Sequence, residues 1–300
     1  MSEQTTVRLF HLPFSFMLPQ RVASERGYFG DEGLRVELVE RDREEVERKY
    51  IPAEETLTDD YDVDLYPICK WESLKRTWEM HDGKVVAKGT FADQPYAVFT
   101  RPDTDVEEPA DLAGVPVGVN RRTGQEYTAI RALEEHVPPE DVTLDHQGMP
   151  TDRLRALRDG EVEAATLLEP HSTLAEELGF ERVMEFENHM GIVGGEQLTG
   201  EALRKFVAGY RRAVEDINEN PAEFRDDYLD MLGKDEAVAP DLFEDVDVDA
   251  VRDQITVPEY EAPELADYDE LREHLDWMKE RDLVDADAEI RSIVAPGGRP

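Results

Sequence analysis

Residues 21–40 read RVASERGYFGDEGLRVELVE, and they predict a helix, a tight turn and a strand. Val22 belongs to an apolar helix face, and Gly27 ends the helix because glycine tolerates positive φ. From Leu34 onward, apolar and polar residues alternate as on a half-buried strand. Another strand is predicted at 7–11 (VRLFH), so the segment forms a strand–helix–strand unit with two parallel strands.

The composition of the 300-residue chain is strongly acidic. Asp and Glu total 71 against 33 Lys and Arg, a formal net charge of −38. The acidic residues are spread along the whole chain, which argues against nucleic-acid binding and against one basic protein partner. Self-repulsion at this density destabilises a compact fold unless it is screened, and at about 1 M salt the Debye length is roughly 3 Å. We therefore interpret the composition as an adaptation to high salt.

The sequence also bounds the location and the cofactor chemistry. No apolar run reaches the length of a membrane-spanning helix, and the first twelve residues lack the pattern of a secretory signal. We therefore expect a cytoplasmic protein, with the outer face of the membrane open if the natural start differs or the chain is a mature form. Cys69 is the sole cysteine, which excludes a disulfide within the chain. We expect no metal and no cofactor.

Further strands and helices alternate up to about residue 190, and helices dominate beyond it. We expect strands at 63–68, 84–91, 96–101, 115–120, 142–146, 164–168 and 181–187. We expect helices at 44–54, 69–80, 109–114, 126–136, 151–159, 172–178, 199–220, 223–232, 248–255 and 266–281. Residues 191–195 (GIVGG) are interpreted as a return point, and 285–300 as a loosely held tail.

Three motifs carry a family resemblance. The pattern A-x-x-x-G-Y-F-x-x-E-G-L-x-V-E, from Ala23 to Glu37, resembles the opening signature of substrate-binding proteins of ABC importers. The relevant branch includes sulfonate, nitrate and thiamine-precursor binders. PADLAGVPVGV (109–119) resembles the opening of their second lobe, and LRDGEVEAATLLEPHSTLAEELG (157–179) resembles a later helix–strand–helix segment.

The resemblance implies an α/β, two-lobed type 2 periplasmic-binding-protein-like fold with a ligand cleft between the lobes. It assigns residues 1–94 plus 190–300 to lobe 1 and residues 95–189 to lobe 2. Tyr28 and Phe29 are expected to be scaffold of the first lobe.

Ligand contacts are expected where strands end and helices begin. The candidates are His11, Phe14 and Ser15, then Lys70 and Trp71, then Asn120, Arg121, Thr123, Gly124, Gln125 and Tyr127, and finally Glu169 and His171. The run 120–125 (NRRTGQ) is the most informative, because a helix N-terminus with adjacent arginines favours an anion.

Several candidates have an alternative interpretation. The arginines of this run are equally compatible with surface pairing to nearby acids. Trp71 is equally compatible with a core position, and His11 with a structural histidine. Glu169 and His171 are expected either to cap a helix or to hydrogen-bond a ligand's amine or hydroxyl.

The enzyme interpretations are weaker. The chain has no GxSxG, HExxH, P-loop or GxGxxG motif, and the calcium-loop-like stretch at 245–256 has Ala250 where glycine is needed and Thr256 where glutamate is needed. Thiamine-pyrimidine synthases resemble the opening signature and use a lysine and a histidine after the third strand with pyridoxal phosphate. Here Lys70 is displaced, and no histidine and no cysteine-rich run stand in the corresponding positions.

Cytoplasmic aromatic-acid decarboxylases also resemble this fold and leave an enzyme alternative open. The interpretation that fits most features is a solute-binding protein that closes on a small polar or anionic organic ligand. It would be the substrate-binding component of an ABC importer, with the importer's permease as a partner.

Overall fold

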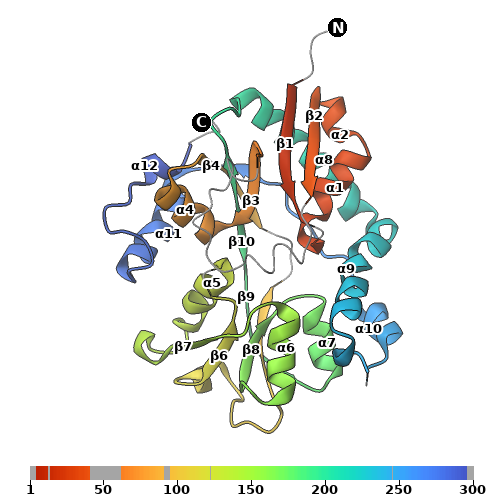
Figure 1. Cartoon of the computed structure of the whole chain (residues 1–300), viewed down its shortest axis with the longest axis vertical. Coiled ribbons are helices and arrows are strands. Elements are labelled where there is room, and N and C mark those ends of the chain that lie inside the picture. Colours follow the sequence, from red (N-terminus) through yellow and green to blue (C-terminus); the bar gives the residue numbers. More distant parts are fainter. Residues whose placement is uncertain are drawn as a thin grey trace. The chain divides into compact units, whose positions relative to one another are not determined.

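The computed structural model describes residues 5–12, 14–40, 62–90, 95–121, 123–244 and 246–295 (Figure 1). The chain divides into two compact units, each with its own β-sheet. Unit 1 comprises Met1–Ala92, His189–Asn220 and Glu259–Pro300, and unit 2 comprises Asp93–Asn188 and Pro221–Pro258. The helix expected at 44–54 lies outside the described residues.

The sheet of unit 1 has the strand order β11-β4-β10-β3-β1-β2. The strands are β1 (Thr5–His11), β2 (Leu34–Glu40), β3 (Leu65–Cys69), β4 (Lys84–Thr90), β10 (His189–Gly194) and β11 (Glu264–Leu265). β1 pairs in parallel with both β2 and β3, which confirms the parallel unit predicted from residues 7–40. β10 runs antiparallel to β3 and β4 in the middle of the sheet, where the sequence predicted only a return point.

The segment between β1 and β2 packs on a long helix of the same unit. It contains η1 (Ser15–Met17), α1 (Leu18–Glu25) and α2 (Tyr28–Asp31), and α8 (Gly200–Glu219) lies beside them (Figure 1). Phe29 is buried and stacks on Phe206 with ring centroids 5.3 Å apart. Gly209 permits this approach, because a Cβ there would lie 2.6 Å from the Phe29 ring. Tyr28 donates to Asp216 at 2.6 Å, so both aromatic residues fix the scaffold, as predicted.

Residues 285–295 are held more firmly than predicted. Unit 1 also contains the helices α4 (Lys70–Met80), α11 (Tyr268–Glu280) and α12 (Ile290–Ile293). Ile293 is fully buried, Val294 forms a bridge with Val85, and Lys84 Nζ donates to the Ser292 carbonyl. The expectation of a loose tail is therefore wrong for residues 285–295, because their apolar side chains pack against β4.

The sheet of unit 2 has the order β7-β6-β8-β5-β9. The strands are β5 (Tyr96–Thr100), β6 (Pro116–Val119), β7 (Thr143–His146), β8 (Ala164–Leu167) and β9 (Glu181–Phe186). β6 is parallel to both β7 and β8, whereas β5 is antiparallel to β8 and β9.

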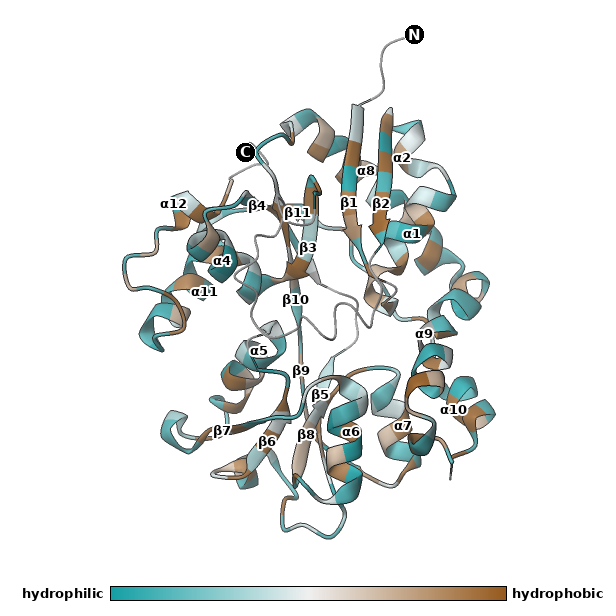
Figure 2. Ribbon diagram, viewed as in Figure 1, coloured by the Kyte–Doolittle hydropathy of each residue, from teal (hydrophilic) through white to brown (hydrophobic). Residues whose placement is uncertain are grey.

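Helices and short 3₁₀ turns connect and cover these strands. The helices are α5 (Gly124–Leu133), α6 (Pro150–Asp159), α7 (His171–Glu177), α9 (Arg225–Val238) and α10 (Val248–Gln254). The 3₁₀ turns are η2 (Pro109–Leu112), η3 (Pro139–Asp141), η4 (Pro221–Phe224) and η5 (Pro240–Leu242). A core of fully buried side chains, among them Val98, Val117 and Ala164, joins the strands. Both α9 and α10 carry hydrophobic as well as hydrophilic residues, shown as brown and teal segments in Figure 2.

Residues 221–258 belong to unit 2, whereas the lobe boundaries inferred from the sequence placed them in lobe 1. Charged contacts hold this segment against α6 and α7. Asp241 accepts from Arg155 at 2.8 Å and from Arg158 at 3.0 Å, and the two guanidinium groups hold the pKa of Asp241 far below its usual range. The buried His171 Nε2 lies 3.3 Å from the buried Asp235 Oδ2.

Candidate functional site

Gln125 organises the carboxyl-end edge of the sheet in unit 2. Its Oε1 accepts the backbone N–H of Asn120 at 2.9 Å, and its Nε2 donates to Thr166 Oγ1 at 2.5 Å. Thr166 in turn donates to the Gly118 carbonyl at 3.0 Å. Gln125 therefore ties the start of α5 to the ends of β6 and β8. Both polar atoms of its side chain are hydrogen-bonded within unit 2.

The N-terminus of α5 lies at this same edge. Thr123 has an extended backbone (φ −132°, ψ 164°), and its hydroxyl donates to the Asn120 carbonyl at 2.7 Å. The backbone N–H groups of Gly124 and Gln125 stand in the first turn, where a helix supplies no acceptor of its own. These N–H groups and the positive end of the helix dipole make the edge suitable for an anion.

The arginines predicted for this edge are placed differently. Arg121 is exposed, and its Nη2 donates to the Leu144 carbonyl at 2.6 Å, while its backbone N–H donates to His146 Nδ1 at 3.1 Å. Arg122 lies outside the described residues. Tyr127 is buried on α5.

Glu169 and His171 follow β8 but have different surroundings. Glu169 Oε2 accepts from the Thr173 hydroxyl at 2.8 Å and from the Thr173 N–H at 3.3 Å. Burial raises the pKa of Glu169, and the bonds from Thr173 oppose that shift. His171 is only 1% exposed and faces Asp235, so it joins α7 to α9 in the interior. Glu169 remains at the strand-end edge.

Arg153 was not among the residues predicted from the sequence, but its buried side chain supports this edge. Its side chain is only 2% exposed, and it donates to the Thr166 carbonyl at 2.7 Å and to the Gly148 carbonyl at 2.6 Å. The guanidinium thus fixes the end of β8 and the loop that follows β7. A helix over 151–159 was predicted, but three arginines in that helix gave no sign of which one is buried.

In unit 1, the residues after β1 are packed among side chains of their own unit. His11 is 3% exposed, and its Nδ1 lies 3.4 Å from Gln20 Oε1. The Ser15 carbonyl accepts from the Tyr260 hydroxyl at 2.7 Å. Phe14 stacks on Phe16 with ring centroids 5.2 Å apart.

Lys70 and Trp71 open α4 beside two further aromatic residues. Lys70 is 4% exposed, and its Nζ donates to His274 Nε2 at 2.6 Å. His274 Nδ1 donates to the Glu270 carbonyl at 2.9 Å, which leaves Nε2 as the acceptor. Trp71 is 3% exposed and packs on Trp277 with centroids 4.9 Å apart, so the structure agrees with its core interpretation.

His189, at the start of β10, was also missed by sequence reasoning. Burial and then the positive charge of Lys70 lower the pKa of His189 to about 4. The imidazole is therefore neutral at pH 7. Its position at the start of a strand was not predicted, because residues 191–195 were interpreted as a return point rather than as part of a strand.

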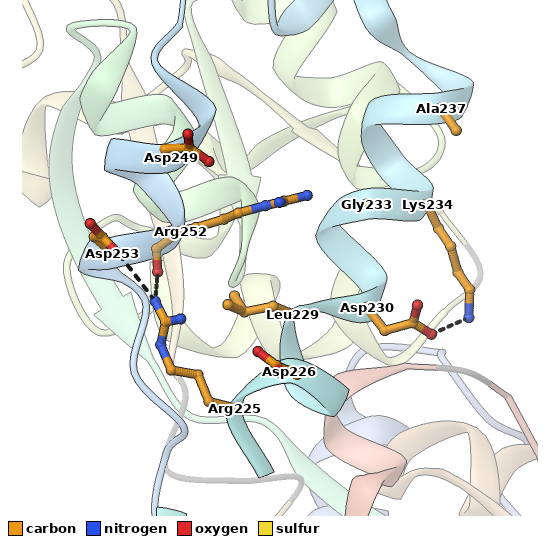
Figure 3. Close-up of a pocket in the computed structure, with 10 residues that line it drawn as sticks. All are labelled: Arg225, Asp226, Leu229, Asp230, Gly233, Lys234, Ala237, Asp249, Arg252 and Asp253. Carbon is orange, nitrogen blue, oxygen red and sulfur yellow. Dashed lines mark hydrogen bonds and ion pairs between the residues drawn. The ribbon is translucent and has the colours of Figure 1, made fainter. Parts of the chain in front are cut away.

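A groove of about 820 Å³ lies between α9 and α10 of unit 2 (Figure 3). Its cationic side chains face carboxylates: Lys234 contacts Asp230 at 2.7 Å, and Arg225 lies 3.7 Å from Asp253. None of the residues predicted to contact a ligand lines it.

Within the described ranges, no three or more His, Cys, Asp or Glu side chains are grouped so as to hold a metal ion. No helix within these ranges combines the length and apolar character needed to cross a bilayer.

Comparisons with known structures identify the fold. The chain aligns with the periplasmic aliphatic sulphonate binding protein SsuA from Escherichia coli at a TM-score of 0.68 and 13% identity, covering 98% of this chain and 93% of that one. The alkanesulfonate-binding protein SsuA from Xanthomonas axonopodis pv. citri, bound to MOPS, gives a TM-score of 0.69 at 12% identity, with coverage of 98% and 99%.

A Candida albicans protein with the generic periplasmic binding protein fold gives a TM-score of 0.64 at 13% identity, with coverage of 98% and 97%. The predicted fold class, that of periplasmic binding proteins, is confirmed. The family model described as NMT1/THI5 like matches residues 17–224, so the chain belongs to the NMT1/THI5-like family. A comparison with curated proteins finds no match.

Proposed function

We propose that this protein is a solute-binding protein that holds a small anionic organic ligand at the N-terminus of α5, as the binding component of an ABC importer. The observation that carries the proposal is the strand-end edge of unit 2. There, Gln125 and Thr123 fix the first turn of α5, and the Gly124 and Gln125 N–H groups have no acceptor within the helix.

Sulfonates are the ligand class to test first. Two solved proteins that share the fold are described as sulfonate-binding, and a sulfonate presents oxygens that several N–H groups can reach together. Neither enzyme alternative is supported by a specific observation at this edge. The partnership with an importer's permease is part of this proposal. The predicted location, in the cytoplasm or on the outer face of the membrane, is part of it as well.

The proposal is tested by removing one backbone donor. Gly124 is the first residue of α5, and proline is accepted at that position because its φ suits a helix start. The extended Thr123 before it also suits proline. Gly124→Pro therefore deletes an N–H while preserving the helix. We expect calorimetric titration to show propanesulfonate binding weakened about tenfold, the worth of one charge-assisted hydrogen bond.

Gly200→Pro is the matched control, because Gly200 is the first residue of α8 and also follows an extended threonine. It should leave the affinity unchanged. Unaltered binding in Gly124→Pro, with an unaltered melting temperature, would contradict an anion site at α5. A panel of sulfonates and aromatic acids that leaves the melting temperature of the native chain unmoved would contradict solute binding itself.

We also propose that the acidic composition is matched to high salt. Raising NaCl from 0.1 M to 1 M should raise the melting temperature, because screening reduces repulsion among the carboxylates. A melting temperature that falls over this range would contradict the interpretation. The binding experiments are accordingly designed at about 1 M salt.

A further inference from the structure

We infer that the groove between α9 and α10 is a second binding site, in which Arg252 holds the carboxylate of a small monocarboxylic acid. The groove encloses about 820 Å³, within the range of about 300–1,000 Å³ that small-molecule sites occupy. It shares no lining residue with the N-terminus of α5, so the inference does not depend on the proposed anion site there.

The guanidinium of Arg252 is directed into this groove. Its side chain extends from α10 toward Gly233 on α9, and a Cβ on Gly233 would lie 3.8 Å from Arg252 Nη2 (Figure 3). The backbone of Arg252 is held by Arg225, whose guanidinium donates to the Arg252 carbonyl. The Arg252 side chain is 40% exposed, so a ligand that enters the groove can reach it.

Arg252 has hydrogen-bonding capacity that its surroundings do not use. Its Nε is buried and has no hydrogen-bond partner within the described part of the chain. Its Nη2 lies 3.6 Å from Glu236 Oε2, which makes an ion pair longer than a hydrogen bond. The two terminal nitrogens therefore remain for a ligand, and the planar guanidinium can donate from both to one carboxylate.

The other two cations that line the groove are engaged by carboxylates. Lys234 contacts Asp230 at 2.7 Å, and Arg225 lies 3.7 Å from Asp253. Of the three lining cations, Arg252 is therefore the one that offers donors to a ligand. Four aspartates line the groove against these three cations, so a second negative charge on the ligand would be repelled.

Gly233 leaves space beside the guanidinium of Arg252. It lies in the interior of α9, where glycine is less favourable than alanine. Outside α9 itself, the only described atom that a Cβ on Gly233 would meet within 4 Å is Arg252 Nη2. Packing therefore does not require a glycine at this position, whereas a bound carboxylate needs the space. Leu229 and Ala237 add apolar surface to the groove, which suits a hydrocarbon body on the ligand.

The test titrates the full chain with benzoate in a calorimeter at pH 7 in about 1 M salt, where long-range repulsion is screened. Arg252→Lys keeps the positive charge but loses the planar pair of donors, so it should weaken benzoate binding about tenfold. Gly233→Leu keeps the guanidinium but fills the space beside it, and it should weaken benzoate at least as much. Benzene-1,3-dicarboxylate should bind the native chain no more tightly than benzoate, because its second carboxylate meets the aspartates of the groove.

Arg272→Lys is the matched control, because Arg272 is an exposed arginine on α11 that pairs with Asp269 at 3.1 Å. It should leave the benzoate affinity unchanged, and so should Gly124→Pro. Benzoate that does not bind the native chain would overturn the inference, as would full affinity in both Arg252→Lys and Gly233→Leu. Loss of benzoate binding in Gly124→Pro alone would place the carboxylate at α5 and would also overturn it.

Propanesulfonate separates this inference from the proposed function. Arg252→Lys should bind propanesulfonate as the native chain does, because the groove shares no lining residue with the start of α5. If propanesulfonate does not bind while benzoate binds and depends on Arg252, the groove site stands and the anion site at α5 does not. A dicarboxylate that binds more tightly than benzoate would overturn the assignment of the groove to monocarboxylates.

Discussion

The strand-end edges of the two units present different chemistry. In unit 1, the residues after β1 and β3 are large or titratable and are packed against side chains: Lys70 on His274, Trp71 on Trp277, and His11 beside Gln20. In unit 2, the corresponding edge is made of backbone N–H groups and small polar side chains held by Gln125. A backbone donor keeps its direction when solvent or ligand changes, so unit 2 is the better preorganised of the two for an anion.

The largest expected effect is the loss of the buried cation beneath the edge of unit 2. Arg153→Met removes the donors to the Thr166 and Gly148 carbonyls and should lower the free energy of unfolding by about 3 kcal/mol. Arg121→Met is the control, because Arg121 is exposed and donates to a single carbonyl; its cost should stay below about 1 kcal/mol.

The tryptophans make this measurement specific to a unit. All three, Trp71, Trp78 and Trp277, lie in unit 1. In urea, tryptophan fluorescence therefore reports unit 1, whereas far-ultraviolet circular dichroism reports both units. We expect Arg153→Met to lower the midpoint of the dichroism signal more than that of fluorescence. A variant as stable as the native chain by both signals would contradict the anchoring role of Arg153.

The next effect tests the close packing of unit 1. A Cβ on Gly191 would overlap Ser73 Oγ and lie 2.7 Å from Ser73 Cβ, in the turn that follows Lys70. Gly191→Ala should therefore cost about 2 kcal/mol through overpacking and should shift the fluorescence transition. Gly30→Ala is the control. A Cβ there meets nothing within 4 Å, and the substitution should be neutral or stabilise by up to about 1 kcal/mol.

The fold was far easier to predict than the site. The opening unit was predicted because its glycines, Gly27 and Gly33, stand where the backbone has φ of 76°, and because the period-two pattern after Leu34 is regular. β10 was missed because HMGIVG shows no alternation: the strand is buried almost throughout, and Gly191 and Gly194 are required by close packing rather than by a turn.

The positions of buried charges could not be predicted from local sequence. Arg153 and the half-buried Arg155 and Arg158 look alike in the sequence of α6, and only the ends of β7 and β8 determine which guanidinium is fully buried. The assignment of residues 221–258 to unit 2 could not be predicted for the same reason. Asp241 meets Arg155 and Arg158 across a separation of more than eighty residues, and no local pattern encodes that contact.

A smaller effect is expected in the pH dependence of stability, to which His189 in unit 1 contributes. The pKa of His189 in the folded state is about 4, below the unfolded value of about 6.5. Between these values the unfolded chain binds a proton that the folded chain does not, so this group makes stability fall as pH drops from about 6.5 to about 4. Compared with the native chain, His189→Gln should lose roughly 1–2 kcal/mol less over this range, a figure reduced for the half-exposed ring.

Urea unfolding at pH 7 and at pH 4.5, followed by tryptophan fluorescence, measures that difference. Burial also raises the pKa of Glu169 in unit 2, and the comparison with His189→Gln separates the contribution of His189 from that of such carboxylates. If both proteins lose the same stability between these pH values, the imidazole of His189 is not kept neutral by its surroundings.

The smallest expected effect concerns Arg121, the cation that the sequence placed at the anion site. Its guanidinium is exposed and already donates to the Leu144 carbonyl at 2.6 Å. Any attraction to a sulfonate at α5 is screened by solvent and salt, so Arg121→Ala should weaken propanesulfonate binding by no more than about twofold. Calorimetric titration beside Gly124→Pro compares the side chain with the backbone donor in one assay. A tenfold loss in Arg121→Ala would mean that the guanidinium leaves Leu144 for the ligand, and that affinity at this edge depends on a mobile side chain rather than on the fixed first turn of α5.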